Sequence, residues 1–505
     1  MTESCVPVLV IGAGPTGLFL AGELARHGVR PRVIEKLPIR HVQTRATEIQ
    51  PAALEALHRA GLAGQVMGAS LPMKGLRFFD DSMKVAFTMG IQPAASPYAT
   101  TRSIPQWRTE EILAEPLALQ GIKVERGVTA ERITVCEREV LVECVDLSGA
   151  TEIIHADYLV GAGGAHSPVR HSLHQDLVGI TYPRHYLVAD VAVNGVHRVG
   201  DHVISVAISP TGLVMVIELP NGRSLLLTDL PDDRLQGTTP GLDDVRAAVA
   251  NHLQVPLDIS DLKWASVYRM HRRMSSKFAN GRCFLAGDAA HLCSPMGGEG
   301  LNSGILDGAS LAWMLAAVLD GRGKPELLEA YEPERQAAAR QILMSSEVMH
   351  EYYQQLVDLC ADGQPLVQPA DDPTLKATSG SMLDVKLTDS PIVGFHGSAL
   401  GVQKLSPGCR FPSRTLLEGT SHHLLVYRLQ DSSKSQDFAA RWSRVLRVVE
   451  GEAICPAAEC GVSEAGAVLV RPDGYVGFLA EKWTPDAIGA LDKLLGSFFT
   501  PAAGS

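Results

Sequence analysis

The chain has 505 residues, of which 46% are hydrophobic, and a formal net charge of −11. This length gives room for more than one domain with a large buried core. The acidic balance, the lack of any block of Lys or Arg and an aromatic content of 5% argue against nucleic acids and anionic membranes as partners. No apolar run approaches the ~18 residues of a membrane span, and the first residues carry no secretory signal pattern. We therefore expect a cytoplasmic protein, either a monomer or a homodimer.

A strand, a glycine-rich turn and a helix open the chain. The apolar run Val8 to Ile11 leads into Gly12-Ala-Gly-Pro-Thr-Gly17, and apolar residues then recur at helical spacing from Leu18 to His27. In a dinucleotide-binding unit Gly12 would make the turn, Gly14 would admit a pyrophosphate and Gly17 would allow close helix packing. The positive end of the helix dipole favours the phosphate charge.

A second strand supports this interpretation. Pro31 to Ile34 ends in Glu35, about 20 residues after the glycines, where a carboxylate accepts ribose hydroxyls in such units. The sequence therefore predicts a dinucleotide site at the first turn.

The middle of the chain is typical of an antiparallel sheet. Three β-type runs, Val203 to Ile208, Leu213 to Leu219 and Ser224 to Thr228, are separated by the turns Pro210-Thr-Gly and Pro220-Asn-Gly-Arg. Apolar runs joined by such turns predict hairpins. Strand alternation nominates Val214, Val216 and Leu226 as pocket residues, with core packing as the alternative.

A second glycine-rich turn follows near residue 290. Cys283 to Ala286 reads as a buried strand, Asp288 stands where the chain leaves the sheet, and Gly297, Gly298 and Gly300 let backbone amides approach a ligand. The helix that starts at about Leu301 would point its unpaired N–H groups at the same site. Its later residues, Ala309 to Leu319, should pack inside the domain.

Beyond residue 324 a helical pattern continues to about Cys360, and a Pro-, Gly- and Ser-rich stretch to about Gly408 reads as a linker. The remaining chain predicts strands at His423 to Arg428 and Arg444 to Val449, a hairpin from Val468 to Leu479 and a closing helix, Thr484 to Phe498. The nine cysteines form neither a Cys-x-x-Cys pair nor a zinc-like pattern, so we expect reduced thiols and no metal.

The two glycine-rich motifs, hundreds of residues apart, together resemble those of the flavin-dependent aromatic hydroxylases, the single-component FAD monooxygenases of the para-hydroxybenzoate hydroxylase type. The resemblance covers about residues 5 to 345 and is greatest to the aromatic polyketide hydroxylases. It implies an α/β fold: a Rossmann-like FAD-binding domain with an inserted β-sheet substrate domain and a C-terminal thioredoxin-like domain. The expected divisions are residues 1–74, 99–180 and 265–345 for FAD binding, 75–98 and 181–264 for the substrate domain, 346–408 for a helix and linker, and 409–505 for the thioredoxin-like domain.

The resemblance also assigns site residues. Arg45 and Gln106 match flavin-proximal positions, Asp288 matches the aspartate that binds the ribityl chain, and Pro295 to Asn302 match the loop beside the isoalloxazine ring. The full set of expected cofactor-binding residues is Gly12, Gly14, Pro15, Thr16, Gly17, Glu35, Lys36, Arg45, Gln106, Gly164, Asp288, Pro295, Gly297, Gly298, Gly300, Leu301 and Asn302. The expected substrate pocket holds Val214, Val216, Leu226, Pro295 and Met296.

One position departs from the family pattern. Gly163-Gly164 stands where relatives carry an Asp-Gly pair, in a segment implicated in binding both FAD and NAD(P)H. The missing carboxylate either alters nicotinamide use or leaves a relaxed turn with no functional consequence.

The implied reaction uses FAD, NAD(P)H and O2 to hydroxylate an aromatic, polycyclic phenolic or polyketide-derived substrate through a flavin C4a-hydroperoxide. Because the flavin carries the chemistry, no protein nucleophile is expected. His291 and Glu299 are weak catalytic candidates; a packed or capping role is favoured for His291, whereas Glu299 would either tune the flavin charge or point to solvent. The alternatives are Baeyer–Villiger oxygen insertion on the same scaffold and an FAD-binding protein without oxygenase activity.

Overall fold

The computed structural model describes residues 2–40, 43–44, 46–91, 93–94, 96–194, 201–230, 235, 237–367, 381–397, 405–412, 415, 417–427, 433–460 and 465–502. Arg45, which the family resemblance assigns to the flavin, lies outside these residues.

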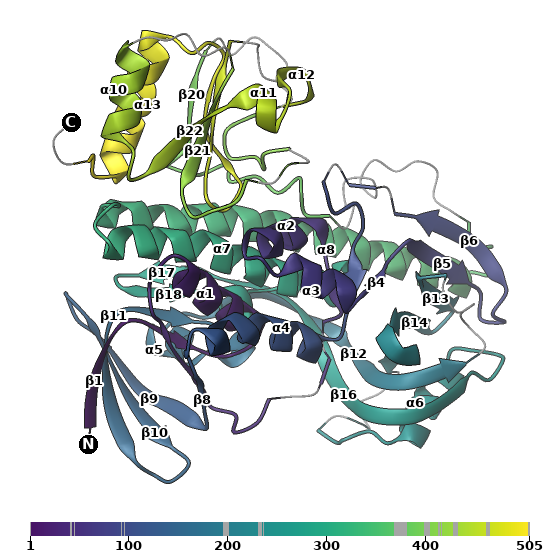
Figure 1. Ribbon diagram of the computed structural model, residues 1–505. Helices are drawn as coiled ribbons and strands as arrows, with labels where there is room; N and C mark the ends of the chain where they lie inside the picture. Colours follow the sequence, from purple (N-terminus) through teal and green to yellow (C-terminus); the bar gives the residue numbers. More distant parts are fainter. Residues whose placement is uncertain are drawn as a thin grey trace.

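The first sheet is mainly parallel and carries both glycine-rich turns (Figure 1). Its strand order is β17 (Ala279–Asn280), β18 (Cys283–Leu285), β11 (Thr151–Gly161), β1 (Thr2–Ile11), β2 (Arg32–Glu35) and β8 (Val124–Arg126), and β10 (Val140–Asp146) joins β11 to β9 (Val128–Val135). β1 pairs in parallel with both β2 and β11, and the buried run Val8 to Val10 lies at its centre. Parallel strands linked through α1 (Pro15–Arg26) form a Rossmann-like unit.

The second sheet is antiparallel except for one pair. Its order is β19 (His291–Leu292), β16 (Asp258–Ser275), β12 (Leu177–Asn194), β15 (Arg223–Leu230), β14 (Gly212–Leu219), β13 (Val203–Ser209), β5 (Gly75–Phe79) and β6 (Val85–Gly90). β13, β14 and β15 form the two predicted hairpins. β12 and β16 run side by side from the flank of the first sheet into the second (Figure 1), so the expected divisions at residues 180 and 264 fall inside continuous strands.

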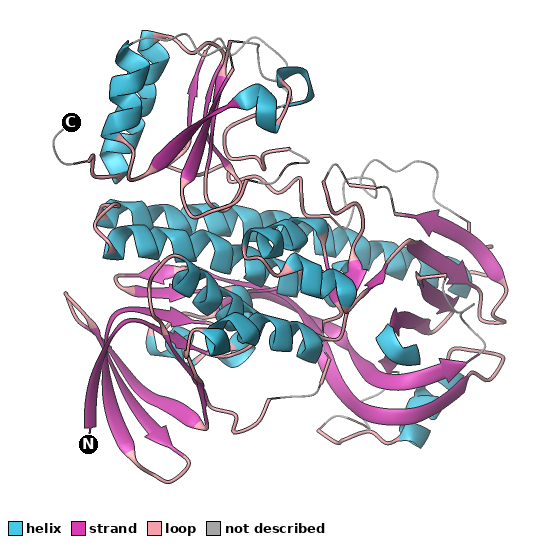
Figure 2. Ribbon diagram, viewed as in Figure 1, coloured by secondary structure: helices cyan, strands magenta, loops and turns pink. Residues whose placement is uncertain are grey.

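Two long helices run side by side through the middle of the molecule (Figure 2). α7 (Gly300–Leu319) is buried on nearly every side, and α1 packs between it and α4 (Gln106–Leu119). By length and composition α7 could cross a membrane, but 89% of its apolar window is buried inside the protein, as in a core helix. α8 (Tyr331–Ala361) follows a 3-10 turn, Pro325–Ala330, and packs its second half on the second sheet.

Short elements complete the body of the molecule. They are α2 (Pro51–Arg59), α3 (Ala63–Gly68), α5 (Pro168–Ser172), α6 (Leu242–Ala250) and a small sheet in the order β3 (Glu48–Ile49), β7 (Arg102–Ser103), β4 (Leu71–Pro72). β3, which follows β2 in the chain, contacts α7 and therefore lies beside the second glycine-rich turn.

The C-terminal part is a five-stranded sheet stacked on α7 and α8 (Figure 1). Its order is β20 (Gly394–His396), β24 (Val476–Ala480), β23 (Ala467–Val470), β21 (His422–Val426) and β22 (Leu446–Glu450), with α10 (Ser433–Arg441) against α13 (Pro485–Phe498) and the short helices α11 (Gly451–Ile454) and α12 (Ala457–Cys460). The sequence analysis missed α10 and placed β20 in the linker. Cys455 is disulfide-bonded, which corrects the expectation of a reduced thiol there.

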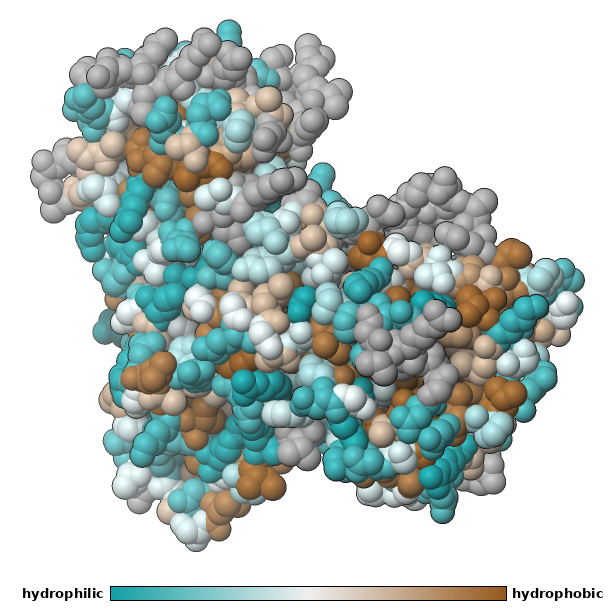
Figure 3. Space-filling model, turned by 45° about the vertical axis from the view of Figure 1, so that its right-hand side comes forward, coloured by the Kyte–Doolittle hydropathy of each residue, from teal (hydrophilic) through white to brown (hydrophobic). Residues whose placement is uncertain are grey.

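The face of the molecule in Figure 3 mixes hydrophilic and hydrophobic residues. The buried apolar residues of the described chain form four clusters. One runs from the first sheet and its helices into one face of the C-terminal sheet, one lies on each face of the second sheet, and one lies on the other face of the C-terminal sheet.

Candidate functional site

The first glycine turn is shaped by close backbone contacts. Gly12 has a φ of +113°, and a Cβ there would lie 2.4 Å from the carbonyl oxygen of Ala162, while a Cβ on Gly17 would lie 2.0 Å from the carbonyl oxygen of Gly12. A Cβ on Gly14 would meet nothing within 4 Å, and Gly14 lines a cavity. Packing therefore requires Gly12 and Gly17, whereas Gly14 leaves the start of α1 open to a ligand.

Glu35 is held at the end of β2 by backbone amides. Its carboxylate accepts hydrogen bonds from the N–H of Ala13 at 2.9 Å and from the N–H of Leu37 at 3.0 Å. Glu35 and Lys36 both line the cavity beside the first turn. The fixed carboxylate is placed to accept a hydroxyl hydrogen bond.

The second motif begins with a tight 3-10 turn, Gly287–Ala289. Gly287 has a φ of +61°, and a Cβ there would lie 2.4 Å from Thr16 Oγ1, so this turn packs directly on the start of α1. Asp288 is exposed and lines the cavity. It does not cap α7, which begins twelve positions later at Gly300.

The third turn, Pro295–Gly297, leads into α7. Gly298 has a φ of +64°, and a Cβ there would lie 2.1 Å from Glu48 Oε2. Asn302 is fully buried and does not line the cavity, so its assignment to cofactor contact is corrected. Its side-chain amide donates to the carbonyl oxygens of Gly298 and Glu48 at 2.7 and 2.9 Å, and its oxygen accepts from the N–H of Gln50 at 2.8 Å. Asn302 therefore holds the turn against β3 from the side away from the cavity.

His291 belongs to a buried ionic network, not to the cavity wall. Its Nε2 lies 2.8 Å from Asp307 Oδ2, while Arg335 Nε donates to Asp307 Oδ1 at 2.7 Å. Burial opposes ionisation of Asp307, but the charge of Arg335 and the hydrogen bonds from His291 and Gly287 lower its pKa to about 2. Because Asp307 also accepts from the N–H of Gly287 at 2.8 Å, the network supports the Asp288 turn. His291 is thus a packed residue, and the weak catalytic candidacy is withdrawn.

Glu299 and Glu48 both line the cavity beside Gly298. Glu299 is 6% exposed, and its Oε1 accepts a hydrogen bond from Ser345 Oγ at 2.8 Å. Burial raises the pKa of Glu48 to about 7, and burial together with the charge of Glu48 raises the pKa of Glu299 to about 7, against the lowering effect of Ser345. The sequence analysis did not single out Glu48; its only signal was its position three residues after Arg45.

The cavity has a volume of about 1210 Å³ and reaches from the glycine turns to one face of the second sheet. Of the residues predicted for the cofactor or the substrate, Pro15, Thr16, Gln106, Gly164, Pro295, Met296, Gly297, Gly300 and Leu301 also line this cavity, and so does Gly163. Gln106 also donates to Glu110 at 2.9 Å. Gly17, like Asn302, is not among its lining residues.

The prediction of Val214, Val216 and Leu226 as pocket residues is wrong. These side chains pack in the cluster on the opposite face of the second sheet. Their neighbours Met215, Ile217, Leu225 and Leu227 face the cavity, with Met215 paired to Leu227 and Ile217 to Leu225. Both faces of these strands are apolar, so alternation reveals two sets but not which set faces the cavity.

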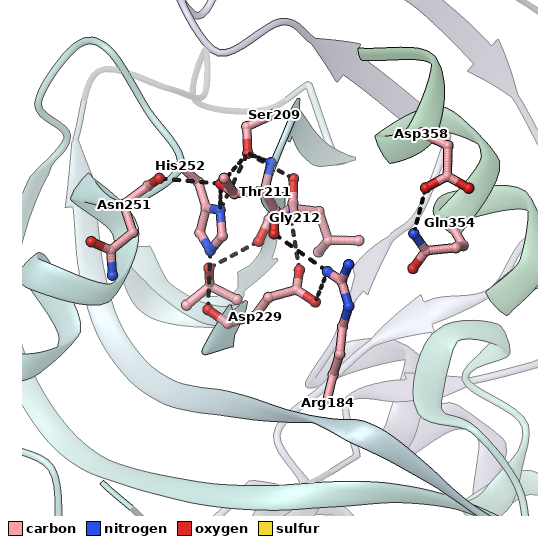
Figure 4. Close-up of polar contacts among 11 residues, drawn as sticks. Arg184, Ser209, Thr211, Gly212, Asp229, Asn251, His252, Gln354 and Asp358 are labelled. Carbon is pink, nitrogen blue, oxygen red and sulfur yellow. Dashed lines mark hydrogen bonds and ion pairs between the residues drawn. The ribbon is translucent and has the colours of Figure 1, made fainter. Parts of the chain in front are cut away.

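A polar cluster at the far end of the β13–β14 hairpin contains the residue types of a hydrolase triad (Figure 4). His252 Nδ1 lies 3.2 Å from Ser209 Oγ, but His252 Nε2 lies 3.0 Å from the backbone oxygen of Asp229. The Asp229 carboxylate instead accepts from the N–H of Leu213 at 2.7 Å. Ser209 is 2% exposed, so this cluster anchors the hairpin and has no access for a substrate.

A Rossmann-like domain whose glycine turns line one large cavity is typical of proteins that bind a dinucleotide cofactor. The family model described as FAD binding domain matches residues 5–346, and the model described as aromatic-ring hydroxylase, C-terminal, matches residues 406–502. The chain belongs to the FAD-dependent aromatic-ring hydroxylases, which are enzymes and use FAD.

Three relatives illustrate the likeness. The chain is 31% identical to 6-methylpretetramide 4-monooxygenase of Streptomyces rimosus, covering 93% of this chain and 90% of the relative. It is similar to the structure of the anhydrotetracycline hydroxylase OxyS of Streptomyces rimosus, with a TM-score of 0.78, 26% identity and coverage of 99% and 100%. The flavin-dependent monooxygenase PieE, in complex with FAD and substrate, shares the fold with a TM-score of 0.83, 23% identity and coverage of 98% and 100%.

Proposed function

We propose that this protein uses NAD(P)H and O2 to hydroxylate a polycyclic, phenolic or polyketide-derived aromatic compound. The observation that carries the proposal is the single cavity that joins the dinucleotide turns to an apolar sheet face. Two relatives are named for 6-methylpretetramide and anhydrotetracycline, which supports a substrate of that kind. We place the reaction in the cytoplasm, and either a monomer or a homodimer suits it.

The residues around the cavity fit FAD. Gly14 leaves the start of α1 open for a pyrophosphate, Glu35 offers a fixed acceptor for ribose hydroxyls, and Asp288 offers one for the ribityl chain. The turn at Pro295–Gly297 and the N-terminus of α7 would lie against the flavin ring. Bound FAD would supply the electron transfer and oxygen activation that side chains lack.

The chain's own part is binding, orientation and exclusion of water. The N-terminus of α7 places unpaired N–H groups where negative charge on a flavin ring would be stabilised. The apolar face of β14 and β15 would cover the substrate and keep water away from the reacting atoms. We accordingly assign the second sheet to an inserted substrate domain and the C-terminal sheet to a thioredoxin-like domain with a structural role.

The test is a screen of neutral polycyclic phenols with the FAD-loaded protein. We expect some of them to accelerate NADPH oxidation and to yield a product heavier by one oxygen atom, carried as a new phenolic hydroxyl. For phenols in the screen that also carry a ketone, a product heavier by one oxygen atom that alkali hydrolyses as an ester would indicate Baeyer–Villiger insertion beside the carbonyl instead. NADPH oxidation that no aromatic compound accelerates, with FAD bound, would favour a non-oxygenating FAD protein.

A further inference from the structure

Charge is distributed unevenly along the cavity wall. Every Lys, Arg and His among the described lining residues, namely Lys36, Arg40, Arg126 and His166, belongs to the loop after β2, the end of β8 or the turn after β11, all on the dinucleotide side. Toward the second sheet the described lining residues are apolar or tyrosine, as in Met73, Phe78, Met215, Leu227 and Tyr353. In the described part of the wall, the substrate half therefore offers no cation to an anionic substrate.

Glu48 and Glu299 lie where the two halves meet. They flank the turn that carries Met296, and Met296 packs in the same apolar cluster as Met215 and Tyr353. The charge of Glu48 also acts on the Tyr353 hydroxyl, whose pKa is raised mainly by burial and further by this neighbour. Both carboxyl groups are thus within the electrostatic reach of a molecule seated on the apolar face.

Neither carboxyl group is neutralised by its described surroundings. Glu299 Oε2 is buried without a hydrogen-bond partner, although its other oxygen accepts from Ser345. The described residues provide no hydrogen bond or ion pair to the Glu48 carboxylate, whose Oε2 packs against Gly298. Unpaired acceptors in a low-dielectric cavity gain from a donor and are penalised by a second negative charge.

We propose, building on the hydroxylase function proposed above, that Glu48 and Glu299 select the charge of the substrate. They favour an uncharged or cationic polycyclic aromatic that presents a hydroxyl or amino donor to them, and they reject aromatics that carry a carboxylate. The two carboxylates act mainly by excluding one class of substrate. Their negative charge repels a substrate carboxylate, and the described wall of the substrate half offers no cation to pair with it.

The test uses the FAD-loaded protein at pH 8 and three probes with one ring skeleton: 2-naphthol, 6-(aminomethyl)-2-naphthol and 6-hydroxy-2-naphthoic acid. Binding is followed by the change in the flavin absorption spectrum, which requires no turnover. We expect the first two probes to bind and the carboxylate to bind more than about tenfold more weakly. A carboxylate that binds wild-type protein as tightly as 2-naphthol, or failure of both donor probes to bind, would overturn the inference.

The variants Glu48→Gln, Glu299→Gln and their combination remove the charge and keep the shape. We expect the carboxylate penalty to shrink to within about threefold in the double variant, while Glu351→Gln, on the exposed side of α8 and outside the cavity, leaves it unchanged. FAD content confirms that each variant is folded. An unchanged penalty in folded variants would contradict the selection.

The two proposals fail in different ways. Oxygenation of all three probes at similar rates would contradict the charge selection but support the hydroxylase function. The expected binding order without any oxygenation would support the charge selection but contradict the hydroxylase function.

Discussion

At the scale of single residues, Asp288 tests the cofactor site most directly. It faces the cavity in a turn that packs on the start of α1. We expect Asp288→Ala to weaken FAD binding by ~1.5–3 kcal/mol, the usual worth of a hydrogen bond to a charged group, and to leave the fold intact. Fluorescence titration of the apoprotein with FAD measures this, with Asp288→Asn as the shape-matched control. Unchanged FAD affinity with a lower melting temperature would make Asp288 a turn residue only.

Gly163 tests the one departure from the family pattern. Its φ of −80° is open to any residue, and a Cβ there would lie 3.3 Å from Pro168 Cδ, a contact that a small shift relieves. We expect Gly163→Asp to fold and to change the affinity for NAD(P)H or the rate of flavin reduction, because a new carboxylate would act locally in the cavity. The flavin spectrum should stay nearly the same. Equal stopped-flow reduction rates in both proteins would show that the glycine is a neutral turn substitution.

Glu299 predicts a pH dependence of stability. Burial and the neighbouring Glu48 raise its pKa from 4.5 to about 7 in the folded protein. Its favourable contribution is therefore complete below pH 4.5 and is lost as the pH rises through 7. Thermal melting from pH 5 to 8 should show a smaller loss of stability in Glu299→Gln than in wild type. Parallel curves for the two proteins would mean that the carboxyl group titrates normally.

At the scale of elements, the two faces of β14 have different tasks. Met215 faces the cavity, whereas Val216 packs in the opposite cluster. We expect Val216→Ala to cost ~1–3 kcal/mol of unfolding free energy through lost packing, with aromatic binding unchanged. Met215→Ala should instead change the affinity for aromatic probes. Urea unfolding measures the change in stability, and titration of the flavin absorption with aromatic probes measures the change in affinity. If Val216→Ala changed the affinity and Met215→Ala only the stability, Val216 rather than Met215 would face the cavity.

At the scale of the whole molecule, a buried ionic joint ties the C-terminal sheet to the body. Arg471, in the β23–β24 turn, donates to both oxygens of Glu334 on α8, at 2.5 and 2.8 Å, and also pairs with Asp473. Trp313 Nε1 on α7 donates to Asp473 at 3.1 Å. The C-terminal sheet is therefore joined to the same helices that carry the cavity turns, and the two regions should unfold together.

Breaking this joint should destabilise the whole protein. Arg471→Met leaves Glu334 and Asp473 buried without their cation, which we expect to cost ~3–5 kcal/mol. Calorimetry with simultaneous flavin fluorescence should show FAD release and unfolding at one lowered temperature. Arg340→Met removes an exposed ion pair with Asp389 and should cost less than ~1 kcal/mol. A separate early transition of the C-terminal region in wild type would argue against a single cooperative unit.

Much of the fold is encoded locally. Gly12 and Gly17, the Asp288 turn, the buried helix after Leu301 and the hairpins of the second sheet are visible in the sequence because each depends on residues a few positions apart. The family resemblance rests on the same local motifs. They account for the glycine-rich turns and for most of the predicted residues that line the cavity.

The tertiary structure decided what lies on each side of those elements. Glu48 packs against Gly298, which lies 250 positions later in the sequence. Asn302 binds the backbone of the Pro295–Gly298 turn and of β3 without lining the cavity, and His291 pairs with Asp307 away from the cavity. Val216 and Met215 differ in role although both are apolar neighbours on one strand. Periodicity reports which residues share a face, but which face meets a cavity depends on packing between segments that are distant in the chain, because burial energy is non-directional and is satisfied equally well on either side.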